Sequence, residues 1–431
     1  MESDEHISWL KPIVSVKRNE LFLCASAILL FFLVIGNSYI IKPIRESLLV
    51  SQFSPEQYPK FYIVVCLITL PVGVALAYLI KRLSPRIAIP VIYVGCAAIF
   101  LFFWIVLFTY REKLQDAQLI GSIFYFWSAV YNVLTVCIFW SLSNALFNQE
   151  QAKRLYGLVG IGGIVGGMLG STLTAYLAEI VTTIGLLPIA ACGLLACAGL
   201  SVSMYKKAYG KISDEAAGQE TVVDIRTLPA VFRSPYVAMI GIMVVLYTTC
   251  ITSVDLQIKG IVRSEGLPRD TITRFWGGYY AYVNGLALIT QIIITSRVLR
   301  RWGPKVGLLF LPLTFLALSP LLLLVPPAYQ VSLPIFGQFP LRIFLLAVVG
   351  VPIGAFAYSI QQSSKELLYV PANAAIKYQA KGIIDIFGFR LGNSVMSLIA
   401  LIGAGGAVAR SFNFAIVAYA LGLFWLFFFF F

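Results

Sequence analysis

The stretch LFLCASAILLFFLVIGNSYIIKPIRESL, from Leu21 to Leu48, decides the class of fold. Its first part, Leu21–Ile41, can cross a bilayer as one helix, since about twenty apolar residues span the hydrocarbon core. Three charged residues, Lys42, Arg45 and Glu46, then follow at or just inside the end of this span. Lys42 and Arg45 are three residues apart and share a helical face if the helix continues. We interpret the two cations as one wall of an anion site in the middle of a transporter.

The composition of the whole chain leads to the same class. Of its 431 residues, 59% are hydrophobic and 12% charged, and the mean hydropathy is +0.88. Soluble domains carry about 25% charged residues, so a water-soluble core could not hide this much apolar surface. The apolar runs are continuous rather than alternating, which favours helices over a β-barrel. We therefore predict an all-α membrane protein that contacts the lipid bilayer directly.

Twelve apolar segments are long enough to span the membrane, six on each side of a polar segment at 206–234. They are Leu21–Ile41, Phe61–Ile80, Ile87–Thr109, Leu119–Phe147, Leu155–Ala178, Ile184–Tyr205, Pro235–Ile258, Phe275–Thr295, Val306–Val325, Leu341–Gln361, Ile383–Ala409 and Phe412–Phe431. This layout is typical of major-facilitator-like transporters with two pseudo-symmetric halves. We divide the chain into a cytoplasmic tail (1–20), a six-helix bundle (21–205), a cytoplasmic linker (206–234) and a second six-helix bundle (235–431).

Several kinds of site are excluded by residue usage. The seven cysteines lie in apolar segments without a CxxC pair, and the single histidine, His6, belongs to the polar tail. This excludes a His-based metal or proton-relay site, and we expect no cofactor. There is no Walker lysine motif for ATP hydrolysis and no basic soluble domain for nucleic acid. The net charge of +13 instead fits cytoplasmic loop bias together with an anionic substrate.

Lysine and arginine are distributed unequally between the two sides of the membrane. With the N-terminus inside, twenty of them fall on the inner side and ten on the outer side. This bias predicts that both termini are cytoplasmic. The outer charges gather after the first and seventh spans, which are equivalent positions in the two halves. Because they include Lys42, Arg45 and Lys259, we interpret this exception as functional.

The fifth span carries glycines at short intervals, in GLVGIGGIVGGMLG from Gly157 to Gly170. The spelling imitates a dinucleotide fingerprint, but that fingerprint needs a preceding strand in a soluble βαβ unit. Small residues four apart allow helix backbones to approach closely in lipid. We predict that this stripe packs against another helix.

A second group of polar residues falls in spans four and seven. Asp255 and Lys259 are four apart on one helical face and can pair, since an unpaired charge there costs about 3 kcal/mol or more. They are either a structural ion pair at the membrane surface or part of a gate or phosphate site that mirrors Lys42 and Arg45. Asn144 lies near the end of span four. Its most ordinary role is polar contact between helices, and contact with the base or ribose of a substrate is the alternative.

Charges also gather around the eleventh span. Lys365 and Glu366 close span ten in SKELLYVP, and Lys377, Lys381 and Asp385 then follow at four-residue spacing on one stripe of a helix entering the membrane. Arg390 lies deeper and needs a partner or a water-filled path. A solvated helix end explains Lys377 alone, but it explains Asp385 and Arg390 poorly.

Four segments give the chain a family resemblance. They are KPIRESL, FWSLSNALFNQEQAKRLYGLVGIGG, VDLQIKGIVR and SKELLYVPANAAIKYQAKGIIDIFGFRLGNS. In order and spacing they resemble segments of the non-mitochondrial nucleotide transporters, the ATP/ADP translocases of intracellular bacteria and plastids. The chain departs from the family pattern at Gly157, Gln379 and Asn393, at Gln151, and at Ala372–Ala374. These departures alter charge or backbone around the expected site and bear on the substrate more than on the fold.

The resemblance implies exchange of ATP for ADP, or of a related nucleotide, by a protein of the bacterial inner membrane, which we expect to be a monomer. It carries the family's charged positions over to Lys42, Arg45, Asp255, Lys259, Lys381 and Asp385. We expect the four cations to hold phosphates and the two aspartates to neutralise them in the empty carrier. Glu46 is the least distinctive member, because a salt bridge to a neighbouring cation explains it equally well.

Two alternatives remain at this point. One is a proton-coupled symporter of another nucleotide-like anion, such as NAD, a nucleotide sugar or a nucleoside, which a protonophore would inhibit. The other is a flippase or membrane enzyme that acts on phospholipids. An enzyme needs catalytic carboxylates in a sizeable aqueous loop, and the longest loop, 206–234, holds only Asp214, Glu215, Glu220 and Asp224. We therefore predict that the protein is not an enzyme.

Overall fold

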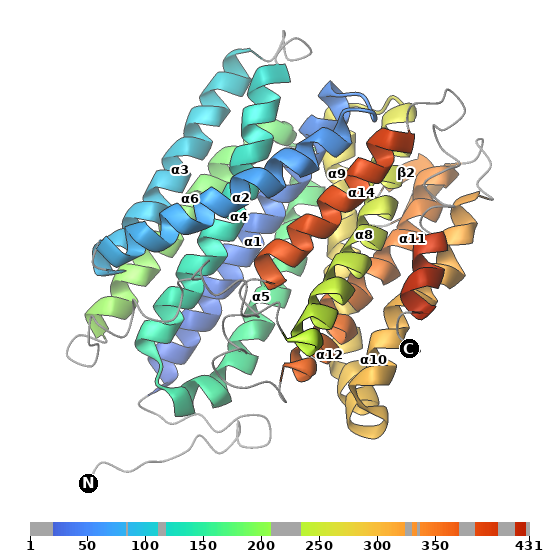
Figure 1. Ribbon diagram of the computed structural model, residues 1–431. Coiled ribbons are helices and arrows are strands. Elements are labelled where there is room, and N and C mark those ends of the chain that lie inside the picture. Colours follow the sequence, from blue (N-terminus) through green and yellow to red (C-terminus); the bar gives the residue numbers. More distant parts are fainter. Residues whose placement is uncertain are drawn as a thin grey trace.

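The computed structural model describes residues 20–82, 85–110, 118–207, 234–323, 330–333, 337–369, 384–403 and 419–427. Within these ranges the chain forms a bundle of long helices (Figure 1). The first six are α1 (Leu21–Gln52), α2 (Tyr58–Arg82), α3 (Pro85–Thr109), α4 (Gln118–Leu146), α5 (Gln149–Leu177) and α6 (Thr182–Lys207). The later ones are α8 (Pro235–Ser264), α9 (Arg269–Thr290), α10 (Ser296–Leu318), α11 (Leu341–Phe356), α12 (Gln362–Leu368) and α14 (Phe389–Gly403). Short π-helical segments, η4 (Gln291–Thr295), η6 (Ala357–Gln361) and η7 (Ile384–Gly388), and the 3-10 segment η5 (Ser319–Leu323) extend them.

The first eleven predicted spans are confirmed as helices in the described residues. Eight stretches are long and apolar enough to cross a membrane, and two shorter apolar helices, Tyr58–Thr69 and Phe389–Ile402, add to them. One of the eight, Arg269–Leu321, holds two passes, because the chain turns at Gly303, whose φ of 76° lies in the left-handed region that glycine adopts readily. The twelfth predicted span, Phe412–Phe431, is described only at 419–427, where it is helical.

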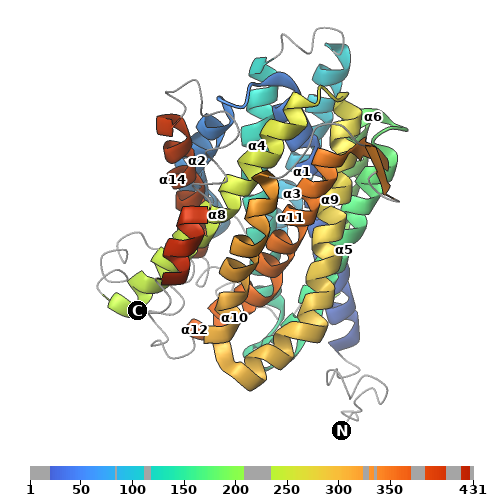
Figure 2. The same ribbon diagram turned by 90° about the vertical axis from the view of Figure 1, so that its right-hand side faces the viewer.

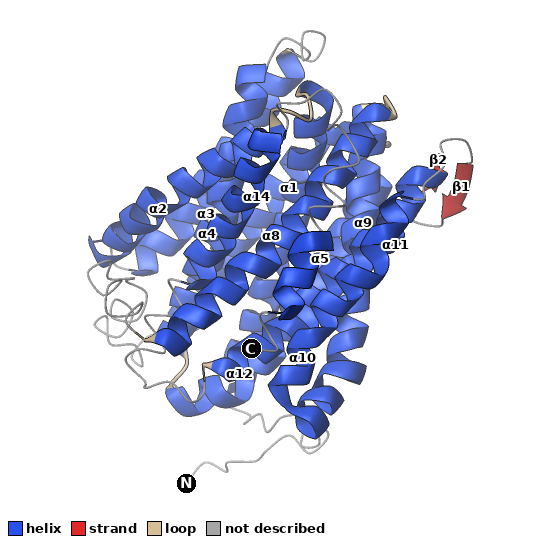
Figure 3. Ribbon diagram, turned by 45° about the vertical axis from the view of Figure 1, so that its right-hand side comes forward, coloured by secondary structure: helices blue, strands red, loops and turns tan. Residues whose placement is uncertain are grey.

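A short hairpin was not predicted. Strands β1 (Gln330–Leu333) and β2 (Gly337–Pro340) pair in antiparallel fashion, with Gln330 opposite Pro340. The hairpin lies at the edge of the bundle beside α11 (Figure 3). It leads directly into α11, so it belongs to the connection between two spans rather than to the core.

Two clusters of buried apolar side chains divide the bundle. One consists of residues from Cys24 to Tyr205, within α1 to α6. The other consists mainly of residues from Val237 to Trp425, joined by the ends of α1 and α2 and by two residues of α4. In Figure 1, α1 to α6 gather on one side and α8 to α12 on the other, and in the view turned by 90° α8, α10 and α11 lie in front (Figure 2). The halves meet where α5 packs on α9, α2 on α14 and α1 on α9.

The glycine stripe of α5 packs against α1, as predicted. A Cβ added to Gly166 would clash with the carbonyl oxygen of Phe32, and one added to Gly170 would clash with that of Gly36. The absence of side chains therefore sets the distance between these two backbones. On α9, a Cβ at Gly277 would lie 2.7 Å from the backbone nitrogen of Ala175, so the contact between the halves is equally close at this point.

The prediction that the first span ends near Lys42 is wrong. Helix α1 passes through Pro43 and ends at Gln52, and α8 continues beyond Lys259 to Ser264. The polar groups in these last turns contact other parts of the protein instead of lipid, so no helix end is needed to expose them to water. Seven of the ten charges assigned to the outer side thus lie inside described helices rather than in loops. They are Lys42, Arg45, Lys60, Lys259, Arg263, Arg269 and Arg274.

Candidate functional site

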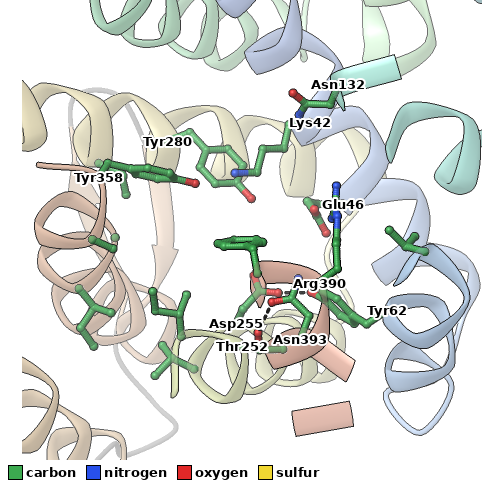
Figure 4. Close-up of a pocket in the computed structure, with 18 of the residues that line it drawn as sticks. Lys42, Glu46, Tyr62, Asn132, Thr252, Asp255, Tyr280, Tyr358, Arg390 and Asn393 are labelled. Carbon is green, nitrogen blue, oxygen red and sulfur yellow. Dashed lines mark hydrogen bonds between the residues drawn. The ribbon is translucent and has the colours of Figure 1, made fainter. Parts of the chain in front are cut away.

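A cavity of about 550 Å³ lies between the two groups of helices (Figure 4). Its walls come from α1, α2 and α4 on one side, and from α8, α9, α11, η6, α12 and α14 on the other. The charged side chains that line it, among the described residues, are Lys42, Arg45, Lys365, Arg390, Glu46 and Asp255. The sequence analysis had selected all six.

Part of the cavity wall is an ion-pair network, which we define as Arg45, Glu46, Tyr62, Asp255 and Lys259. The Lys259 ammonium lies 2.8 Å from Glu46 Oε2 and 2.7 Å from Asp255 Oδ2. It also donates to the Tyr62 hydroxyl, which itself donates to Asp255. Arg45 pairs with the other oxygen of Glu46, and its Nε lies 3.1 Å from that oxygen.

The network joins the two halves. Arg45, Glu46 and Tyr62 belong to α1 and α2, whereas Asp255 and Lys259 belong to α8. Only 1% of the Lys259 side chain is exposed, and it is not among the residues that line the cavity, because Glu46 and Asp255 cover it. Two acids and two bases balance each other here, which is what keeps charges tolerable at this depth.

Lys42 lies one helical turn before Glu46 in very different surroundings. Its ammonium lies 4.1 Å from the ring centre of Tyr280, 5.3 Å from that of Tyr39 and 6.0 Å from that of Tyr358. These three rings, which we call the aromatic wall, hold the cation through their negative faces. Within the described part of the chain, Lys42 forms no ion pair.

Helix α14 supplies two further polar groups. Arg390 and Asn393 lie three residues apart on one face and both line the cavity. A hydrogen bond of 2.8 Å joins the Thr252 hydroxyl on α8 to Asn393 Oδ1, which fixes the asparagine in place (Figure 4). No ion pair of Arg390 is formed with any described residue.

The other predicted residues are distributed less tightly. Lys365 is buried in the wall of the cavity, whereas Glu366 accepts a hydrogen bond of 3.2 Å from Gln362 and does not line it. Asn144 lies outside the cavity and accepts a hydrogen bond of 2.6 Å from the Tyr156 hydroxyl, which is the helix-to-helix role of the two considered. Lys377 and Lys381 lie outside the described residues, as does the side chain of Asp385.

Three tyrosines of the site were not predicted from the sequence. Tyr62 completes the ion-pair network, and Tyr280 and Tyr358 form most of the aromatic wall (Figure 4). Tyrosines in membrane spans usually anchor helix ends at the interface. A signal was nevertheless present in the GGYYAYVNG segment, since Tyr279 and Tyr280 lie within the predicted span and well inside α9 rather than at either helix end.

The end of the bundle where α1 ends and α2 begins, which the charge bias predicts to be the outer end, is sealed by polar contacts between the halves. Asp270 on α9 accepts hydrogen bonds from the backbone nitrogen of Thr183 (2.7 Å) and from its hydroxyl (2.6 Å). Arg274 pairs with Glu179, and Arg263 donates to the Ser51 carbonyl at 2.7 Å. We call these contacts the outer seal. They lie nearer the helix ends than the ion-pair network does.

Comparison with known proteins identifies the family. The model of the TLC ATP/ADP transporter family matches residues 114–429, which is more than half of the chain. The chain belongs to this family. The resemblance inferred from the four sequence segments is thereby confirmed.

Individual relatives are distant. An "ADP,ATP carrier protein 1" of Chlamydia trachomatis is 23% identical over 71% of this chain and 63% of that protein. An "ADP,ATP carrier protein 3" of Rickettsia prowazekii is 22% identical over 89% of this chain and 87% of that protein. The chain thus spans less than two thirds of the chlamydial relative and most of the rickettsial one.

Solved transporter structures share the fold. The nucleoside transporter NupG superimposes with a TM-score of 0.60 at 14% identity, covering 96% of this chain and 98% of that one. A D-xylose-proton symporter also gives a TM-score of 0.60 at 14% identity, covering 95% and 97%. The predicted fold class, an all-α membrane protein of major-facilitator type with two six-helix halves, is confirmed.

Proposed function

We propose that the protein is a membrane transporter that exchanges ATP for ADP, or a related nucleotide, by alternating access. The observation that supports this most directly is the cationic cavity between the halves of a chain that belongs to the TLC ATP/ADP transporter family. Lys42, Arg45, Lys365 and Arg390 outnumber the two described acids that line it. An excess of buried cations favours an anion, and a volume of about 550 Å³ falls within the range of small-molecule sites.

The arrangement of the seal supports an inward-facing state. We infer that the outer seal and the ion-pair network close one end of the cavity, and the excess of inner Lys and Arg places the opposite end toward the cytoplasm. In this orientation both termini are cytoplasmic. For a bacterial protein the membrane is the inner one. Since all of the described cavity walls come from one chain, we propose that the monomer is the working unit.

The ion-pair network offers a physical reason for exchange. If the halves separate at the outer end, Lys259 on α8 leaves Glu46 on α1, and both charges lose a partner in a region of low dielectric. A bound phosphate can take the place of the carboxylate during this step. The empty carrier has no such substitute and therefore switches slowly. Asp255 stays paired with Lys259 on the same helix, which limits the free-energy cost of separating Lys259 from Glu46.

Uptake into proteoliposomes tests this function. Labelled ADP is offered outside vesicles that contain ATP, ADP or buffer alone, with and without a protonophore. We expect uptake that depends on internal nucleotide and is unaffected by the protonophore. Equal uptake into empty vesicles contradicts exchange, and collapse of uptake with the protonophore indicates proton symport. If no member of a nucleotide, NAD and nucleotide-sugar panel is transported or competes, the proposed substrate class is wrong.

A further inference from the structure

The charges around the cavity do not all compensate each other. Arg45 and Lys259 are balanced by Glu46 and Asp255 in the ion-pair network. This leaves Lys42, Lys365 and Arg390 among the described cations that line the cavity. Lys365 has an interaction partner of its own, and Lys42 is held by the aromatic wall. Arg390 is therefore the lining cation for which the described residues supply neither a carboxylate nor an aromatic ring.

The position of Arg390 makes this lack of compensation costly. It lies on α14 and lines the same cavity as Arg45, which is a second positive charge. Both described acids that line the cavity already have partners. Glu46 accepts from Arg45 and Lys259, and Asp255 accepts from Lys259 and Tyr62. A cation within a membrane span that faces a cavity and has no counter-charge among the described residues indicates a ligand of opposite sign.

We propose that Arg390 is a phosphate-binding residue of the transported nucleotide, and that it acts with Lys42 from the opposite half. A guanidinium can donate two parallel hydrogen bonds to one phosphate, whereas the Lys42 ammonium acts as a point charge. Asn393 lies on the same face of α14 as Arg390 and accepts a hydrogen bond from Thr252 of α8, so it offers a neutral polar group beside the guanidinium. The inference rests on the proposed function as far as the nucleoside part of the ligand is concerned. The prediction that an anion binds here depends on Arg390 and its surroundings alone.

Binding measurements on the purified protein in nanodiscs distinguish the anion site at Arg390 from the proposed nucleotide function. The ligands are adenosine, ADP, ATP and pyrophosphate, and the variants are Arg390→Gln, Arg390→Lys and Arg300→Gln, an exposed arginine outside the cavity. We expect Arg390→Gln to weaken ADP, ATP and pyrophosphate by about 10- to 100-fold, as expected for a lost hydrogen bond to a charged group, and adenosine by less than about twofold. Arg390→Lys keeps the charge but loses the fork, so its affinities fall in between. Arg300→Gln binds like the wild type.

Each outcome decides something. Phosphate ligands that bind Arg390→Gln as tightly as the wild type overturn the role of Arg390 and leave the proposed function intact. If Arg390→Gln is not recovered folded, Arg390→Lys decides, and an unchanged ratio of ADP to adenosine affinity overturns the proposal. If the wild type binds pyrophosphate through Arg390 but no nucleotide, the proposed function is wrong and the anion site stands. Failure of the wild type to bind any of these anions overturns both.

Discussion

Lys259 and Lys42 show two ways of keeping a lysine inside a membrane protein. Lys259 belongs to the ion-pair network, with a carboxylate on each side at 2.7 and 2.8 Å and only 1% of its side chain exposed. Lys42 belongs to the aromatic wall, where its nearest described partner is the Tyr280 ring at 4.1 Å. In the first arrangement, carboxylates of the protein neutralise the charge of the lysine. In the second, the charge of the lysine remains available to an anion in the cavity.

The difference assigns separate tasks to the two regions. The network is neutral and crosses between the halves, and Lys259 at its centre lies behind the cavity surface, so it is suited to holding the two halves together. Two rings of the aromatic wall, Tyr280 and Tyr358, line the cavity, and the wall holds a cation without neutralising it, so it is suited to binding. Loss of a network residue should therefore affect stability first, and loss of a residue at the wall should affect transport first.

The largest effect is expected for Lys259→Met. It leaves Asp255 without its cation and Glu46 with Arg45 alone, and removing one member of a buried pair costs about 3–5 kcal/mol. The thermal unfolding midpoint of the purified protein should fall clearly below that of the wild type. Lys206→Met, at an exposed position near the end of α6, is the matched control and should change little.

A triple variant sharpens this prediction. Lys259→Met combined with Glu46→Gln and Asp255→Asn removes the stranded charges, and part of the lost stability should return. A Lys259→Met protein as stable as Lys206→Met would show that the network does not hold the halves together in the way its geometry indicates.

Lys42→Met should give the reverse pattern. Because Lys42 has no described ion pair, its removal strands no carboxylate, and the unfolding midpoint should stay near that of the wild type. Exchange of ADP should fall by about tenfold or more, as expected for loss of one charge-assisted contact with phosphate. The comparison between the two lysines fails if Lys42→Met exchanges at the wild-type rate, or if it loses as much stability as Lys259→Met.

The outer seal can be weakened separately with Asp270→Asn. The amide keeps the shape of the side chain but gives up the negative charge that receives two bonds from Thr183, a change worth about 1–2 kcal/mol. The balance should shift toward the state open at the outer face. A cysteine introduced at the buried Gln52 should then be alkylated faster by an impermeant reagent added outside. Glu150→Gln, an exposed change at the start of α5, is the control; equal alkylation in both variants would remove Asp270 from the seal.

Features that depend on residues close together in the chain could be predicted from the sequence, whereas contacts between distant residues could not. Apolar runs predicted the first eleven spans, because the length of a span depends on local composition. The spacing of Asp255 and Lys259 predicted their pairing, because both lie on one face of α8. The contact of Lys259 with Glu46 depends on how the two halves meet, and no local pattern contains that information.

The end of α1 was mispredicted for a related reason. A charged residue after an apolar run normally marks the membrane surface, and Lys42 fits that rule as long as its neighbours are taken to be lipid. In the structure its neighbours are Tyr280 and Tyr358 of the other half, so the helix continues for ten more residues to Gln52. Arg390 could be recognised because a charge so deep in a span requires an explanation whatever surrounds it.

The smallest effect, and the finest test of the aromatic wall, is expected at Tyr280. Tyr280→Phe keeps the ring below the Lys42 ammonium, whereas Tyr280→Leu keeps apolar contacts but removes the π face. A cation–π contact of about 0.5–1 kcal/mol corresponds to a change of about two- to fivefold. The KM for ADP exchange should therefore rise by about this amount in Tyr280→Leu and by less than about twofold in Tyr280→Phe. In a Lys42→Met background the two Tyr280 variants should become equal, since the cation is gone. If Leu and Phe still differ there, Tyr280 contacts the substrate itself, and the wall is a binding surface rather than a holder for Lys42.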